Sequence, residues 1–329
     1  MYRKRFDGME CSIARALDEV GERWSLLIVH ECMLGAARFD AFRKRLGIAR
    51  NILATRLERL IERGIVERCR LTQRARLDGY RLTEKGNALS EIIVALAAWG
   101  DRWVPPVDSA GDPGMVVHAE NNAPVQGSGW FAAASADIPN AFFHKLRHET
   151  SSAITTGMYR KRFDGMNCSI ARALDEVGEW WTLLIVRECT QGSKRFDEFQ
   201  SALGIARNIL TARLERLIEL GILERFPLPE RANTFGYRLT QKGVDLYPVL
   251  VALMQWGDKW LWSNGKPTVK LLDDESGRPV EPVGVHAPDG RALTFREVRF
   301  APGPGATKST REIIEKRNER VLGDESEDS

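Results

Sequence analysis

The sequence is poor in cysteine and has no long apolar run. It contains five cysteines in 329 residues, and no two of them have the spacing of metal ligands. We therefore expect neither a disulfide framework nor a zinc site. None of the apolar runs is long enough to span a bilayer, and the first residues lack the apolar centre of a signal peptide. These absences predict a cytoplasmic protein without a membrane partner.

The motifs of common enzyme classes are also missing. The sequence has no P-loop, no dinucleotide-binding glycine fingerprint, no nucleophile elbow and no H-E-x-x-H zinc motif. Its five histidines stand in dissimilar contexts, and His30 is replaced by Arg187 in an internal repeat, which favours a surface position. We therefore expect no enzymatic activity, no catalytic residues and no cofactor.

The internal repeat is the most prominent feature of the chain. Each position n in residues 1–103 matches position n+157 without a gap, and roughly 70 of these positions are identical. This similarity predicts one fold that is present twice. We expect one unit at residues 1–103, a linker at 104–157 and a second unit at 158–260.

Each unit contains the pattern of two helices joined by a tight turn. Between residues 39 and 66, a short apolar run precedes Gly47, a residue able to adopt the left-handed conformation that ends a helix. The segment after Gly47 has apolar residues at helical spacing, namely Leu53, Leu57, Leu60 and Ile61. The residues left facing outward at the start of this second helix have short or hydrogen-bonding side chains that suit base edges in a major groove: Arg50, Asn51, Ala54 and Thr55. The same spacing also occurs in helical hairpins that only pack on a neighbour.

A wing and three further helices complete each unit. After Gly64, a polar segment separates two short apolar stretches, which predicts a two-stranded wing. Helices are predicted at residues 11–20 and 24–33, and a long last helix at 84–103 with Thr83 as its cap. The fold class is mainly α with small β wings (α+β). The first and last helices carry more apolar side chain than one unit can cover, so we expect them to meet another unit.

The net charge of +3 is unevenly distributed. It amounts to about +6 for residues 1–103, about +2 for 158–260, about −3 for the linker and about −2 for the residues that follow. The positive charge is thus concentrated on the repeated units, as expected of a surface that binds phosphates. A surplus of arginine is also common on surfaces that bind nothing.

The remaining segments have a different composition. Residues 104–157 are rich in Pro, Gly, Ala, Ser and Asn, and we expect a mostly disordered linker with at most a short helix near 141–148. Strands predicted at 268–272, 280–286 and 291–300 form a small β appendage at residues 261–305. Residues 306–329 are expected to form a charged helix and a disordered acidic tail.

Several segments of both units together resemble the HxlR-type winged helix-turn-helix regulators, a bacterial family related to the MarR type. They include CSIARALDEVGE from Cys11 and Cys168, LGIARNIL from Leu46 and Leu203, and YRLT from Tyr80 and Tyr237. The resemblance implies a DNA-binding homodimer that is formed through the first and last helices. It also implies that the second helix of the motif enters the major groove of double-stranded DNA and that the wing contacts the backbone or the minor groove.

This resemblance assigns DNA-contacting roles to twelve residues of the two units. They are Arg50, Asn51, Ala54, Thr55, Arg74, Arg76, Arg207, Asn208, Thr211, Ala212, Arg231 and Asn233. The chain departs from the family pattern because two units are fused, so a single polypeptide can supply the pair that two chains otherwise supply. The C-terminal segment also lacks the paired cysteines of longer relatives, so we expect it to be free of metal.

In some relatives a cysteine at the start of the first helix senses oxidants, and Cys11 and Cys168 occupy this place. The helix N-terminus and the nearby Arg15 or Arg172 are expected to lower the pKa of each thiol. The alternative is a small, buried and unreactive residue at the interface between helices. Tryptophans at helical spacing could likewise line a pocket for a small-molecule effector, although such residues more often belong to a core or an interface: Trp24, Trp99, Trp103, Trp181, Trp256 and Trp260.

Two functional hypotheses follow. The first is a transcriptional repressor whose two winged helices read an imperfect inverted repeat, since the reading helices differ where Ala54 and Thr55 become Thr211 and Ala212. The second is a ligand-binding or protein-binding scaffold in which at least one winged helix no longer binds DNA. It is suggested by the replacement of Arg43, Lys44 and Arg45 by Gln200, Ser201 and Ala202.

Overall fold

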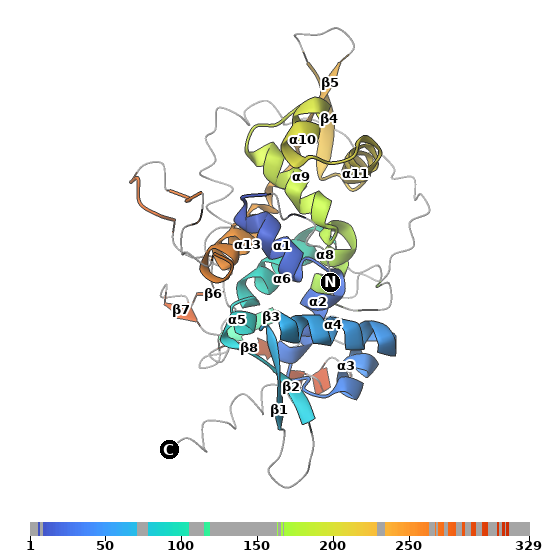
Figure 1. Cartoon of the computed structure of the whole chain (residues 1–329), viewed down its shortest axis with the longest axis vertical. Coiled ribbons are helices and arrows are strands. Elements are labelled where there is room, and N and C mark those ends of the chain that lie inside the picture. Colours follow the sequence, from blue (N-terminus) through green and yellow to red (C-terminus); the bar gives the residue numbers. More distant parts are fainter. Residues whose placement is uncertain are drawn as a thin grey trace.

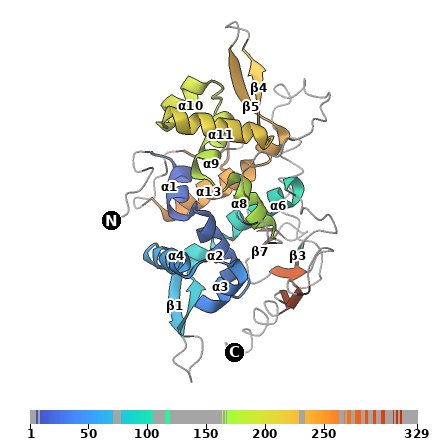
Figure 2. The same cartoon turned by 90° about the vertical axis from the view of Figure 1, so that its right-hand side faces the viewer.

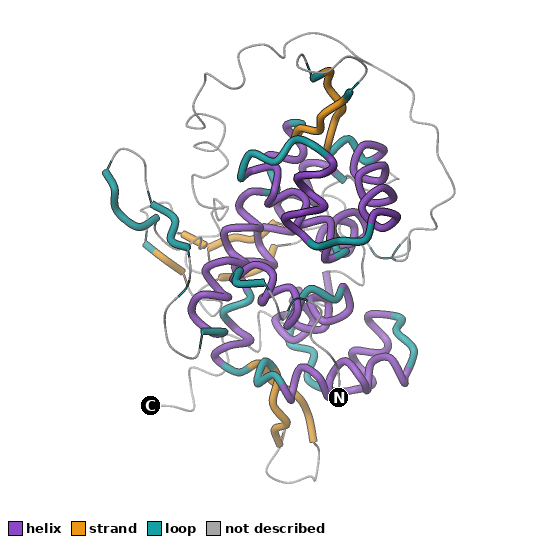
Figure 3. The backbone as a smooth tube through the Cα atoms, turned by 45° about the horizontal axis from the view of Figure 1, so that its top comes forward, coloured by secondary structure: helices purple, strands orange, loops and turns teal. Residues whose placement is uncertain are grey.

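The computed structural model describes residues 6, 9–70, 78–104, 115–118, 163, 166, 168–228 and 234–262, together with short stretches between 267 and 315. Helices dominate these residues, and strands are confined to short antiparallel pairs (Figure 3). The same order of elements occurs twice, once in each half of the long axis (Figure 1). The chain is therefore an α+β protein with two winged helix-turn-helix units.

The first unit follows the predicted order with one change in its last helix. Its elements are α1 (Ser12–Val20), α2 (Arg23–Met33), α3 (Phe39–Leu46), α4 (Arg50–Glu62), β1 (Val66–Arg70), β2 (Asp78–Leu82), α5 (Glu84–Asn87) and α6 (Ser90–Trp103). The second unit repeats them as α8 (Ser169–Val177), α9 (Trp180–Thr190), α10 (Phe196–Leu203), α11 (Arg207–Glu219), β4 (Leu223–Pro227), β5 (Phe235–Leu239), α12 (Gln241–Val244) and α13 (Tyr247–Trp260).

The core of each unit forms around its second helix. Leu27, Ile28 and Val29 of α2 are inaccessible to solvent, and the apolar stripe of α4 packs on this helix. Gly47 ends α3 in the left-handed conformation with φ 61°, as its position between two apolar runs predicted. A left-handed residue here turns the chain sharply, and α4 can therefore lie across the core.

The prediction of one continuous last helix is wrong. Thr83 does cap a helix, since its Oγ1 accepts a hydrogen bond from the backbone N–H of Gly86 at 3.1 Å. The helix stops at Asn87, however, and a turn at Ala88 and Leu89 precedes α6. Gly86 packs so closely on the Ile65 carbonyl oxygen that an added Cβ would lie 2.1 Å from it. The turn therefore holds α5 against this carbonyl while α6 points toward the other unit.

The two units pack on each other through their first and last helices. Helix α1 lies on α13, α8 lies on α6, and α6 also contacts α13. The contacts are reciprocal: the Nε1 of Trp99 donates to the Lys242 carbonyl at 2.9 Å, and that of Trp256 donates to the Lys85 carbonyl at 3.1 Å. Equivalent residues thus exchange equivalent contacts, which is the signature of a two-fold arrangement, here within one chain.

The wings project from opposite ends of the paired units (Figures 1 and 2). In the first wing β1 pairs with β2 in an antiparallel register that joins Val66 to Leu82, and in the second β4 pairs with β5 with Leu223 opposite Leu239. None of the described helices has the length and apolarity needed to cross a bilayer.

The appendage and the linker differ from their predictions. The predicted hairpin forms, but only as β6 (Val285–His286) paired with β7 (Ala292–Leu293). Within the predicted strand at 291–300, the described segments β7 and β8 (Val298–Ala301) belong to different pairs, and β8 pairs with a strand of the linker, β3 (Met115–His118). The first predicted strand is reduced to an isolated bridge between Leu272 and Pro279. The prediction that the linker contains no element other than a helix near 141–148 is therefore wrong at residues 115–118. Residues 141–148 lie outside the described residues.

Candidate DNA-reading surface

Helices α4 and α11 begin at the surface of their units, and both start without a side-chain cap. Ala49 and Ala206 occupy the N-cap positions, and neither provides a side-chain hydrogen bond to the first turn. The first backbone N–H groups of each helix therefore remain available to an external acceptor, where the helix dipole favours negative charge. Phosphate oxygens of a duplex have this chemistry.

The residues predicted to read bases lie on the exposed side of these two helices. Arg50, Asn51, Thr55, Arg207, Asn208, Thr211 and Ala212 are exposed, and Ala54 is half-buried. Each threonine hydroxyl donates to its own helix, Thr55 Oγ1 to the Asn51 carbonyl at 2.9 Å and Thr211 Oγ1 to the Arg207 carbonyl at 3.0 Å. Their methyl groups and oxygen lone pairs therefore remain available for contacts with another molecule.

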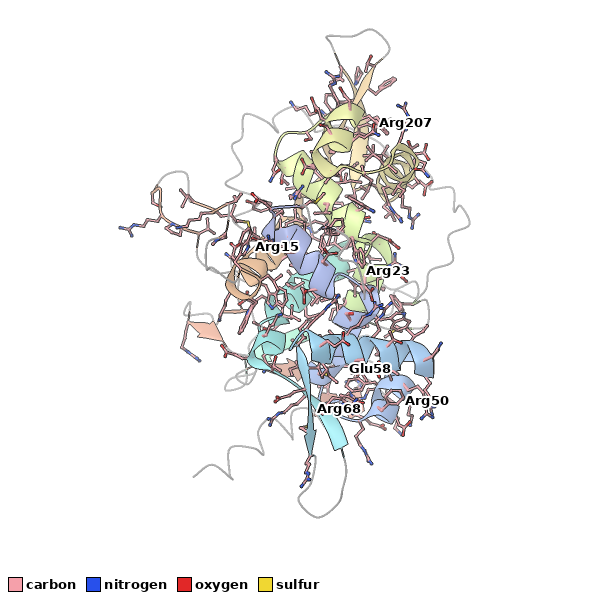
Figure 4. All side chains as sticks on the ribbon, in the orientation of Figure 1. Arg15, Arg23, Arg50, Glu58, Arg68 and Arg207 are labelled. Carbon is pink, nitrogen blue, oxygen red and sulfur yellow. The ribbon has the colours of Figure 1, made fainter. Side chains whose placement is uncertain are left out.

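The arginines at the start of α4 and α11 are supported by aromatic rings. The guanidinium carbon of Arg50 lies 5.9 Å from the centre of the Phe39 ring, and that of Arg207 lies 5.2 Å from the centre of the Phe196 ring. Figure 4 shows the two arginines in opposite halves of the molecule. A cation held against a ring face keeps its charge and most of its hydrogen-bond donors free.

Arginines farther along α4 and α11 have a structural role instead. Arg56 and Arg59 both pair with Glu22, which precedes α2, and the Arg59 contact measures 2.9 Å. In the second unit Arg213 pairs with Glu179 at 3.3 Å. These ion pairs connect the middle of each helix to its own unit, whereas Arg50 and Arg207 in the first turns are exposed.

The wing residues of the prediction cannot be placed. Arg74, Arg76, Arg231 and Asn233 lie outside the described residues. The described part of the first wing carries Arg68 and Arg70 with exposed side chains on β1. Neither residue was predicted to contact DNA, although alternation along β1 places both on one face of the strand.

Comparison with known proteins identifies the family of the chain. The family model described as HxlR-like helix-turn-helix matches residues 19–108 and 176–264, which is more than half of the sequence. The chain belongs to this family. Membership makes this HxlR-type chain a DNA-binding transcription regulator.

The chain is also similar to individual proteins. MT3179 of Mycobacterium tuberculosis, named an uncharacterized HTH-type transcriptional regulator, is 42% identical over 144 residues, which cover 44% of this chain and 90% of the relative. The HTH-type transcriptional regulator YodB of Bacillus subtilis is 37% identical over 95 residues, 29% of this chain and 85% of its own length. Among solved structures, that of PA1607 is 44% identical and covers 39% of this chain and 89% of its own, with a TM-score of 0.37.

The two reading surfaces of the HxlR-type chain differ in charge. Arg43 and Lys44 of α3 are exposed, whereas α10 has Gln200 and Ser201 at the equivalent positions. Helix α10 also gains Glu198, whose carboxylate accepts hydrogen bonds from the backbone N–H groups of Lys194 and Arg195. These bonds lower the pKa of Glu198, which therefore stays charged. The second unit thus offers less positive charge to a duplex.

The cysteines at the start of the first helices have unequal surroundings. Cys11 Sγ accepts a hydrogen bond from Arg187 Nη1 of the other unit at 2.9 Å. Burial raises the pKa of Cys168 to about 11, despite opposing contributions from the N–H groups of Ala171 and Ile170 and from Arg172. The expectation that the helix N-terminus lowers the thiol pKa is therefore wrong for Cys168, because desolvation outweighs it.

The surface position predicted for His30 and Arg187 is also wrong. Both residues are buried, with 9% and 8% of their surface exposed. Burial lowers the pKa of His30 to about 4, and its Nδ1 has no hydrogen-bond partner within the described part of the chain. The second unit covers this part of α2, which the repeat pattern did not reveal.

The tryptophans belong to the core and to the interface between the units. Trp99 and Trp256 are buried and bond across the interface as described above, and Trp103 Nε1 donates to Asp245 of the other unit at 3.0 Å. Trp24 meets Phe163 edge to face, with 4.8 Å between ring centres. Groups of His, Cys, Asp and Glu able to hold a metal ion are absent from the described residues.

Proposed function

We propose that this chain is a transcriptional repressor that reads an imperfect inverted repeat with the two winged helices of one polypeptide. The reciprocal packing of α1 on α13 and of α8 on α6 is the observation that carries the proposal. It unites two exposed reading helices in one chain and covers the apolar faces that a homodimer would otherwise need.

In this proposal the first turns of α4 and α11 enter successive major grooves. Arg50 and Arg207 reach guanine edges or phosphates, and Asn51 and Asn208 reach adenine edges. The half-sites lie about one helical turn, roughly 34 Å, apart. The wings follow the backbone or the minor groove with Arg74, Arg76, Arg231 and Asn233. Ala54 and Thr55 face one half-site, whereas Thr211 and Ala212 face the other. The two half-sites therefore differ in sequence at the bases that these residues contact.

Binding sites selected from random duplexes test this proposal. The single variants Arg50→Ala and Arg207→Ala should each weaken binding to the selected site by about 1–3 kcal/mol and relax one base position if the arginine reads a base. Arg278→Ala, an exposed arginine of the appendage, is the matched control. A loss that is equal for all duplexes would assign the arginines to phosphate, and the absence of any selected site would refute the proposal.

An effector is part of the proposal. Oxidation of Cys11 would act at the contact with Arg187, and hence on the packing of the two units. A small molecule bound near the interface would act on the same packing. The expected readout is weaker binding to the selected site after diamide treatment, an effect that Cys11→Ser should remove. Binding that diamide leaves unchanged would eliminate oxidant sensing but not DNA binding.

A second candidate function is favoured by the charge difference between the units. Without the exposed cations of α3, the second unit could serve as a scaffold that supports the first. Titration of the selected site with Asn51→Ala and with Asn208→Ala decides between the two functions. The repressor predicts that both variants lose affinity, whereas the scaffold predicts that Asn208→Ala binds like the parent chain.

A further inference from the structure

Large apolar side chains are rarely exposed on the described residues, and two of them occupy equivalent positions on the reading helices. Ile52 of α4 and Ile209 of α11 each expose 38% of their surface. The other exposed large apolar side chains, Phe235, Val269 and Leu272, have no such equivalent. Among the described residues, Ile52 and Ile209 are thus the one exposed apolar pair that repeats across the two units.

These isoleucines lie outside the buried stripes of their helices. Leu53, Leu57 and Leu60 of α4 are almost fully buried and form its contact with the core. Ile52 lies in the first turn, directly after Arg50 and Asn51, and all three side chains are exposed. A ligand that covers the exposed part of this isoleucine would remove apolar surface from water, which is favourable.

We infer that Ile52 and Ile209 are specificity-determining residues that contact the 5-methyl group of a thymine in each half-site. The inference rests on the proposed function and deepens it. The thymine methyl is the one apolar group that a base pair presents in the major groove, and aliphatic side chains recognise it by contact. Cytosine in place of thymine lacks this methyl group, so the isoleucine would lose its apolar contact.

The neighbouring asparagine makes the assignment more specific. Asn51 and Ile52 are consecutive on the helix and point about 100° apart, so they reach adjacent parts of the groove. An asparagine amide pairs with the N6 and N7 atoms of adenine. The sequence Arg-Asn-Ile, identical in α4 and α11, therefore predicts the same A·T-containing core in both half-sites. Differences between the two half-sites would then arise from contacts of the residues at positions 54, 55, 211 and 212.

Replacement of thymine by deoxyuridine tests the inference, because it removes only the methyl group. Each thymine of a site selected from random duplexes is replaced in turn, and binding is measured by fluorescence anisotropy. We expect two thymines, related by the two-fold axis of the site, at which affinity falls about fourfold, the effect of one buried methyl group. Replacement of both together should weaken binding about fifteenfold.

The double variant Ile52→Ala/Ile209→Ala supplies the second arm. It should bind the thymine and deoxyuridine sites equally, while Val269→Ala, also an exposed apolar residue, should discriminate like the parent chain. Circular dichroism verifies that the double variant is folded. A parent chain indifferent to every replacement, or a double variant that still discriminates at the same thymines, would overturn the inference while leaving DNA binding intact. Failure to select any site would refute the proposed function itself.

Discussion

At the scale of single residues, the surroundings of a side chain in the interface determine its pKa and its partners, so residues that are equivalent in sequence can differ in reactivity. Cys11 and Cys168 are equivalent in sequence, yet Cys11 faces the Arg187 guanidinium, whereas burial raises the pKa of Cys168. The equivalent positions 30 and 187 hold a neutral histidine and an arginine. The fused pair is therefore not chemically symmetric.

Cys168 should react slowly with iodoacetamide. With a pKa of about 11, about a thousandth of this thiol is thiolate at pH 8, and only the thiolate reacts. Peptide-level mass spectrometry of the folded protein should show a rate that rises about tenfold per pH unit between pH 7 and 9. The same peptide labelled in denaturant is the control, and labelling of the folded chain at the denatured rate would contradict the buried thiol.

His30 should make the protein sensitive to mild acid. Its pKa is lowered to about 4 by burial, so between its ordinary pKa of 6.5 and pH 4 the unfolded chain binds more protons than the folded one, and stability falls as pH falls. His30→Leu removes this proton uptake. Urea unfolding should show that the free energy of unfolding of the variant, relative to that of the parent chain, increases from pH 7 to pH 4.5. A difference that does not change with pH would argue against a buried, neutral His30.

At the scale of elements, apolar periodicity predicted most of the helices and turns that form within each unit. The stripe of Leu53, Leu57 and Leu60 predicted α4, and Gly47 predicted the turn before it. The break before α6 was missed because the buried Leu89 in the turn continues the apolar spacing of α6. Strand β3 was missed because a four-residue strand in a segment rich in Pro and Gly has no period to detect. The reading residues of α4 and α11 came from their outward position, and their role in DNA binding stays a prediction.

Two glycines control how closely the last helices approach the other unit. A Cβ added to Gly100 would lie 2.3 Å from the Ser169 carbonyl oxygen, and one added to Gly257 would lie 2.5 Å from that of Ser12. Gly100→Ala and Gly257→Ala should each lower the free energy of unfolding by about 1–3 kcal/mol, because backbone must move to relieve the overlap. Asn87→Ala, at an exposed helical position, is the control. Unchanged denaturation midpoints would contradict the close packing of these glycines on the backbone of the other unit.

At the scale of the whole molecule, the central feature is that one chain contains a reciprocal pair of winged helices. The first and last helices of each unit are covered by the other unit, and the two reading helices remain exposed on opposite halves (Figure 4). In the proposed function, the pair therefore needs no second polypeptide. Fusion also allows the two reading surfaces to diverge, which two identical chains cannot do.

The mass of the complex between this chain and its selected operator tests that account most directly. Native mass spectrometry should find one 37.1 kDa polypeptide per duplex, and the ratio should not change as protein concentration rises past saturation. Two polypeptides on one inverted repeat, with a single chain unable to occupy it, would contradict the account.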